Sequence, residues 1–167
     1  MNKTMSHTSM PHIMTRLTLA TLAACATIIS IPETAFAGSD DVVVESPWAR
    51  AVIGTTRPGA AYLIVRNIGT EAVTLRGIAT PLAMMAEIHQ STVSADGVSL
   101  MARAGQIEIA PGDSAALEPG GLHAMLMMLQ GPMVVGETFP LTLTFDDGSE
   151  IVVEVPILGV AARGPDG

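Results

Sequence analysis

Two histidines in the second half of the chain stand on segments whose residue alternation turns them away from an apolar face. Read with the two-residue period of a β-strand, His123 and Met125 in the segment 122–129 project opposite to the aliphatic residues. The segment 84–90 turns His89 away from its apolar side in the same manner. Both imidazoles therefore project away from the predicted core and are available to bind a ligand.

A third segment, 97–103, adds Met101, which also lies opposite the aliphatic residues of its strand. A turn at 94–97 is expected to fold this segment back on 84–90 and to place His89 opposite Ala102, one residue from Met101. Imidazole nitrogen accepts copper and zinc, whereas uncharged thioether sulfur selects Cu(I) over harder ions. Read from spacing alone, the alternative is that these are structural histidines and core-filling methionines.

The spacing of these four residues resembles the motif H(M)-x10-M-x21-H-x-M of the periplasmic copper chaperones called PCuAC. The likeness extends to SPWARA (46–51), IEIAPG (107–112) and FPLTLTF (139–145). It implies an all-β, cupredoxin-like antiparallel β-sandwich or barrel with no enzymatic activity. The implied ligands of a single Cu(I) are His89, Met101, His123 and Met125.

The resemblance also implies partners. Cu(I) would pass to an apo copper-site protein such as the copper centre of cytochrome c oxidase, directly or through a Sco-type thioredoxin-like chaperone. The sequence departs from the family pattern at two points. Gln90 stands where some members carry a further methionine, and residues 157–167 hold none of the His and Met that enrich the C-terminal extension of others. These departures leave the Cu(I) ligand set intact, but the resemblance gives no basis for a tight Cu(II) site.

The organisation of the chain favours one exported β domain. Residues 1–37 have a basic start, an apolar run and Ala35-Phe36-Ala37, which are typical of a secretory signal peptide cleaved after Ala37. A lipobox-like Leu22-Ala23-Ala24-Cys25 is the alternative, with Cys25 as a lipid anchor. We expect residues 38–158 to form the domain, 159–167 to be a disordered tail, and the location to be the periplasm.

Short β-rich segments separated by turn signals predict the strands of this domain. The turn signals include Pro111-Gly112-Asp113 and Asp146-Asp147-Gly148. The predicted segments are 59–67, 72–80, 84–90, 97–103, 105–110, 114–118, 122–129, 139–145 and 150–158. Segments of this kind at such spacing indicate a sandwich or barrel.

The net charge of the chain without its leader limits the kinds of partner that it can bind. Without Lys3, Arg16 and Glu33 of the leader, six basic and 15 acidic residues remain, a net charge of −9. This argues against nucleic acid or an anionic membrane as partner. We expect a monomer with no integral membrane segment after cleavage.

Several other functions compete with delivery of copper. A blue-copper electron carrier needs a cysteine thiolate, and the only cysteine, Cys25, lies in the leader. A copper enzyme with an N-terminal histidine brace does not fit, because cleavage after Ala37 exposes Gly38. A periplasmic copper storage or tolerance protein, and a metal-free β-sandwich serving as an interaction module, both remain open.

Overall fold

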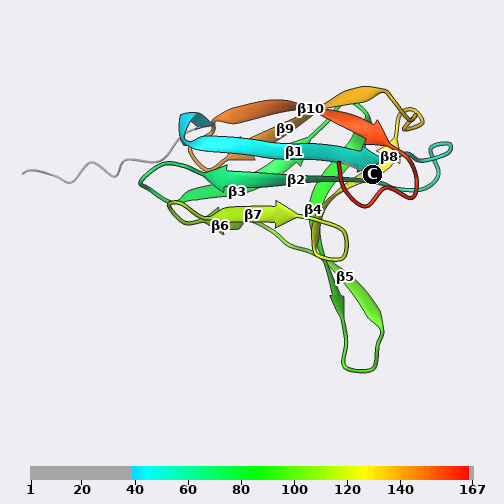
Figure 1. The fold of residues 1–167 in the computed structure, drawn as a ribbon, viewed down its shortest axis with the longest axis horizontal. Helices are drawn as coiled ribbons and strands as arrows, with labels where there is room; N and C mark the ends of the chain where they lie inside the picture. The colour runs from blue at the N-terminus through cyan, green and yellow to red at the C-terminus, as the bar shows by residue number, and fades with distance from the viewer. Residues whose placement is uncertain (1–38, 166–167) are drawn as a thin grey trace, which may run out of the picture. The chain divides into compact units, whose positions relative to one another are not determined.

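The computed structural model describes residues 39–165, and ten β-strands make up most of this part of the chain (Figure 1). A short 3-10 helix, η1 (Ser39–Asp41), precedes the first strand. The strands are β1 (Val42–Arg50), β2 (Gly59–Asn67), β3 (Val73–Ala79), β4 (Ala83–Val93), β5 (Ser99–Arg103), β6 (Ile107–Ile109), β7 (Ser114–Leu117), β8 (Leu122–Leu129), β9 (Thr138–Phe145) and β10 (Glu150–Leu158). The predicted all-β class is confirmed.

The strands follow one another across the sheet in the order β5-β4-β8-β7-β2-β1-β10-β9-β3-β6. Most neighbours are antiparallel, as predicted, but β1 pairs with β10 and β7 with β8 in parallel. The β1–β10 pair is short, with Ala49 opposite Ile157 and Arg50 opposite Leu158. It joins the six strands from β5 to β1 to the four from β10 to β6.

Both groups of strands pack on one hydrophobic core. The inward-facing side chains, which alternate with outward-facing ones along each strand, make up this core. On β8, Ala124 and Leu126 are fully buried, and Ile88 of β4 is buried beside them. Leu141, Leu143 and Phe145 of β9 belong to the same core cluster. The inward faces of β4 and β8 are thus fixed by burial, because a one-residue slip would expose them.

A hairpin made of β4 and β5 extends from the body of the molecule (Figure 1). β5 is the outermost strand of its end of the sheet, and all five of its residues are exposed. β4 continues from the hairpin into the body, where it pairs with β8. The hairpin therefore carries part of the sequence-predicted metal site beyond the core.

The close packing of β2 against the loop after β8 depends on one glycine. A Cβ at Gly59 would collide with the Sδ atom of Met133, which is itself buried. Gly59 starts β2 and pairs with Leu126 of β8. Absence of a side chain at Gly59 therefore lets β2 start beside the strand that carries two of the candidate ligands.

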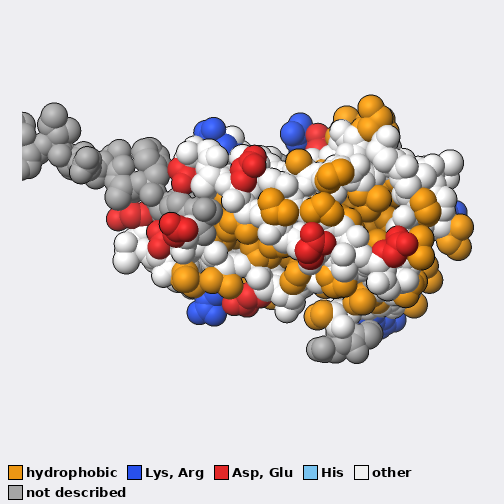
Figure 2. Space-filling model, turned by 90° about the horizontal axis from the view of Figure 1, so that it is seen from above, with side chains coloured by type: hydrophobic (Ala, Val, Ile, Leu, Met, Phe, Trp, Pro, Cys, Tyr) orange, Lys and Arg blue, Asp and Glu red, His pale blue; other side chains and the backbone are white. Residues whose placement is uncertain are grey.

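The surface is mixed in character. Figure 2 shows acidic side chains spread among apolar ones over one face of the molecule. Arg50 lies over the rings of Trp48 and Tyr62, 5.7 Å and 5.5 Å from their centroids, so this cation is engaged in the fold. The full sequence has a net charge of −8.

The segment after β10 contacts the body, because Arg50 Nε donates a hydrogen bond of 2.8 Å to the carbonyl of Ala162. The expectation of a disordered tail over residues 159–167 stays a prediction. The expected signal peptide (1–37) and the lipobox at Cys25 lie outside the described residues. Among residues 39–165, no helix is long and apolar enough to cross a membrane.

Candidate metal centre

Three adjacent strands, β5, β4 and β8, bring the two histidines together. His89 of β4 lies directly opposite His123 of β8, and on its other side opposite Arg103 of β5. Residues directly opposite each other in an antiparallel pair project from the same face. The two imidazole centroids are 6.2 Å apart with an interplanar angle of 46°. Metal–nitrogen bonds are about 2.0–2.1 Å long, so this spacing leaves room for one ion between the rings.

The two methionines of the motif lie on the same face as the histidines. Met125 is opposite Glu87, one step of the ladder from the histidine pair. Met101 is opposite Ser91, one step away on the other side. The register therefore places the four side chains on one face, on three successive rungs, while their convergence on one ion and their role as ligands stay predictions.

The register of the β4–β5 hairpin differs by one residue from the one predicted. Arg103, and not Ala102, lies opposite His89. The loop has five residues because Ser94 binds Val98 twice, with its backbone N–H donating to the Val98 carbonyl and its Oγ accepting from the Val98 N–H. This register is the one that places Met101 on the same face as His89.

His123 is more enclosed than a surface ligand. It is only 7% exposed, because β8 is an interior strand with β4 on one side and β2 and β7 on the other. Its Nδ1 lies 3.1 Å from the carbonyl oxygen of Gly121. A carbonyl can only accept, so Nδ1 carries the proton and Nε2 keeps the lone pair that a metal would need.

Glu87 and Arg103 form a charged group beside His89 that the sequence analysis did not assign to the site. Glu87 Oε2 lies 3.2 Å from His89 Nε2, and Glu87 Oε1 lies 3.3 Å from Arg103 Nη1. A carboxylate favours the tautomer with the proton on Nε2, which leaves Nδ1 of His89 as the available lone pair. The alternation that selected His89 and Met101 also places both charged residues on this face. It was therefore the sequence signal from which Glu87 and Arg103 could have been identified.

Sulfur is essential to any metal site at this place. Within residues 39–165, no three His, Cys, Asp or Glu side chains are grouped so as to hold a metal ion. The histidine pair alone supplies two nitrogens, and Met101 and Met125 supply the only soft sulfur ligands on the adjoining rungs. The donor set therefore fits a soft ion such as Cu(I) and not a hard one.

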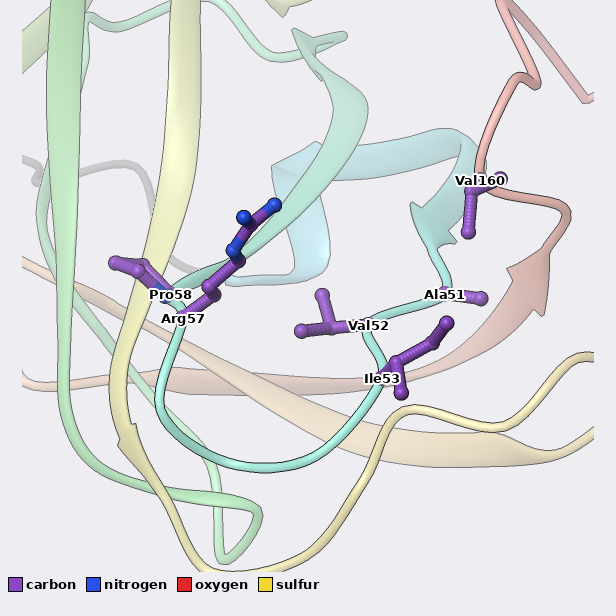
Figure 3. A pocket seen from close by; sticks show the side chains of 6 residues that line it. All are labelled: Ala51, Val52, Ile53, Arg57, Pro58 and Val160. Carbon is purple, nitrogen blue, oxygen red and sulfur yellow. The ribbon is translucent and has the colours of Figure 1, made fainter.

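A pocket elsewhere on the molecule lacks the histidine and methionine side chains of the candidate metal site. It lies at the loop that follows β1 and is lined by Ala51, Val52, Ile53, Arg57, Pro58 and Val160 (Figure 3). Five of these six side chains are aliphatic or proline, and none belongs to the histidine and methionine group. It offers no set of metal ligands.

The sequence is similar to one protein family and to two individual proteins from bacteria. The profile of the LpqE-like lipoprotein family matches residues 42–157. The protein Lxx21020 of Leifsonia xyli subsp. xyli, which carries a lipoprotein designation, is 35% identical over 121 residues, covering 71% of this chain and 70% of its own length. The protein RP573 of Rickettsia prowazekii is 29% identical over 115 residues, 66% of this chain and 63% of its own length.

Solved structures with the same fold include a copper protein. The solution structure of CuI-DR1885 from Deinococcus radiodurans has a TM-score of 0.56 at 31% identity, over 70% of this chain and 76% of that chain. The copper-bound PCuAC domain from PmoF2 has a TM-score of 0.58 at 21% identity, over 71% and 93%. The predicted cupredoxin-like fold and the resemblance to PCuAC are confirmed.

Proposed function

Because the chain belongs to the LpqE-like family, we propose that it is an exported copper chaperone, a binding protein and not an enzyme. It binds one Cu(I) with two imidazoles and two thioethers. The ligands are His89, Met101, His123 and Met125. The observation that carries the proposal is the ladder register, which sets the two histidines opposite each other and one methionine on each adjoining rung.

The fold of two copper-bound proteins supports the choice of metal, since CuI-DR1885 and the copper-bound domain from PmoF2 share it. The donor chemistry supports the oxidation state, because thioethers prefer Cu(I). The lipoprotein designations of the family and of Lxx21020 support export. The periplasm is the compartment we propose.

Release is proposed to begin at the exposed ligand. Met101 stands on the outermost strand and is 53% exposed, whereas His123 is enclosed. An incoming ligand of an acceptor protein can therefore replace Met101 first, while the other three residues retain the ion. The proposed acceptors are the copper centre of cytochrome c oxidase or a Sco-type thioredoxin-like protein.

X-ray absorption of the Cu(I)-loaded protein tests the ligand set. We expect one Cu(I) per chain bound by two nitrogens and two sulfurs, with sulfur near 2.3 Å, about the length of a metal–sulfur bond. Cys25→Ser should be used as the background, so that the leader thiol supplies no sulfur. A spectrum without a sulfur scatterer would overturn the proposal.

A further inference from the structure

Several methionines of β4 and β8 lie on the surface of the molecule, and not in the core. Met84, Met85 and Met128 are 72%, 41% and 51% exposed, and Met127 is half-buried. Of the methionines in the described part of the chain, only Met133 is buried. Methionine ordinarily fills gaps in cores. Packing therefore does not explain the exposed methionines that lie next to one another.

Two of these methionines are direct partners on the ladder. Met85 of β4 lies opposite Met127 of β8. The next rung toward the histidines pairs Glu87 with Met125, and the one after it pairs His89 with His123. Three thioethers therefore lie on two successive rungs of the face that carries the proposed copper ligands.

The spacing suits a shared ion. Directly opposite residues have Cβ atoms about 4.5–5.5 Å apart, and residues two apart on a strand are separated by about 6.8 Å. Metal–sulfur bonds of about 2.3 Å require two bound sulfurs to lie within about 4.6 Å of each other. The three rotatable bonds of methionine allow the sulfurs to approach to that distance, and the exposure of Met85 gives an ion access from solvent.

We propose that Met85, Met127 and Met125 form a second site, built from thioethers alone, for a soft monovalent cation such as Cu(I) or Ag(I). This site goes beyond the proposed function, and shares only Met125 with it. The carboxylate of Glu87 lies on the adjoining rung, where it contacts His89 and Arg103, so the thioethers alone are left to hold the ion. Because thioethers bind no proton in the accessible pH range, the site holds its ion in acid, where imidazoles are lost to protonation.

The shared residue connects the two sites. An ion on Met85 and Met127 reaches the histidine pair by keeping Met125 as a ligand while the other two sulfurs are exchanged for His123 and His89. No electron or proton is transferred in this step, which only replaces sulfur ligands by nitrogen ligands. The second site is thus a place of entry for the ion, on the side of the histidines away from Met101.

Silver titration followed by NMR of ¹³C-labelled methionine methyl groups tests the site residue by residue. The full chain with Cys25→Ser serves as the parent, since a thiolate would bind Ag(I). We expect the methyl signals of Met101 and Met125 to move with the first binding event. The signals of Met85 and Met127 should move together with a second, weaker constant, because the first ion already holds their shared partner Met125.

The variant Met85→Leu should abolish the shift of the Met127 methyl, because Met127 is then the only thioether of the second site that the first ion does not hold. The matched control is Met84→Leu, an exposed neighbour on the opposite face, which should leave the Met127 shift unchanged. Met127 signals that stay still at saturation, or that shift with the same constant in Met85→Leu, would overturn the second site. Failure of the proposed function would be a different result, namely Met85 and Met127 responding while the Met101 methyl signal does not.

Discussion

Met101 is the candidate ligand that the fold leaves most exposed, and this separates its effect on copper from its effect on stability. Met101→Leu keeps the volume of the side chain and removes the sulfur. We expect the free energy of unfolding to change by less than about 0.5 kcal/mol, as at most surface positions. Cu(I) affinity should fall by at least the roughly tenfold that loss of even an outer-shell partner costs.

Competition with a Cu(I) probe ligand measures this change. Met84→Leu is the control, since Met84 is even more exposed and lies on the opposite face of β4. An affinity for Met101→Leu equal to that of the parent would remove Met101 from the ligand set.

Glu87 is expected to orient His89 without touching the metal. Glu87→Ala should lower Cu(I) affinity by roughly 10–100-fold, as loss of outer-shell partners of histidine ligands does. Glu87→Gln should recover part of this loss, because its amide oxygen can still accept from His89 Nε2. X-ray absorption should show the same two nitrogens and two sulfurs in all three proteins.

The exposed Glu108 of β6 provides a control for the loss of a negative charge. If Glu108→Ala weakened Cu(I) binding as much as Glu87→Ala, the effect would be general electrostatics and not orientation of His89.

The identities of the candidate residues could be predicted from sequence, but two features of their setting could not. Alternation within a strand is local, and it correctly placed His123 and Met125 on one side. The one-residue error at Met101 came from the loop length, which Ser94 and Val98 determine by hydrogen bonds across the turn. The burial of His123 depends on which strands flank β8, and the local pattern carries no information on that.

At the level of elements, Asn67 joins the end of β2 to two other segments. Its side-chain amide donates to the carbonyls of Glu71 and Ile109, at 2.7 Å and 3.0 Å, and its Oδ1 accepts from the Gly69 N–H. Asn67 is fully buried. Asn67→Ala leaves these groups unpaired, at about 1–3 kcal/mol each, so we expect a loss of about 3 kcal/mol or more.

Urea denaturation measures the loss, with Gln130→Ala as the matched control. Gln130 also donates through its amide to a backbone carbonyl, that of Met128, but at an exposed position. Its removal should cost less than about 0.5 kcal/mol. Equal stability of the two variants would show that burial of the Asn67 amide contributes nothing.

Strand positions were largely predictable because turn residues punctuate this chain. The predicted segments 59–67, 122–129 and 150–158 coincide with β2, β8 and β10. The strand β1 was not predicted. It contains Pro47 and a residue of positive φ, Ser46, and its register with β2 shifts between Glu45 and Trp48. A strand interrupted in this way has no alternation for the two-residue period to detect.

At the level of the whole molecule, acid should weaken retention of copper. Protons compete with Cu(I) for imidazole nitrogen but not for thioether sulfur. Affinity at the histidine site should fall between pH 8 and pH 5, with a limiting slope of about two decades per pH unit if both His89 and His123 bind.

A competition titration across this range, corrected for proton binding by the probe, measures the slope. His89→Ala should reduce it to about one decade per unit. An affinity that does not change with pH would mean that neither histidine is a ligand.

The order of the strands in the sheet was beyond the reach of the sequence pattern. Hairpins such as β4–β5 and β9–β10 join neighbours in the chain, and turn residues indicate them. The parallel pair of β1 and β10 joins residues at opposite ends of the domain, and nothing in either segment identifies its partner. The local pattern predicted a sandwich or barrel in general, and the family resemblance added the cupredoxin-like fold.

The pairing of the first strand with the last also sets when the protein can fold. A chain that emerges N-terminus first presents β1 before β10 exists, so the two groups of strands cannot be joined until residue 158 has emerged. Pairings between distant residues make folding slow, on the order of milliseconds to seconds for β-sandwiches. Until then the edges of β1 and β9 are exposed to other chains. Loading of the histidine site with copper is therefore a late event, which follows synthesis of β10 even though His89, Met101, His123 and Met125 all lie before residue 126.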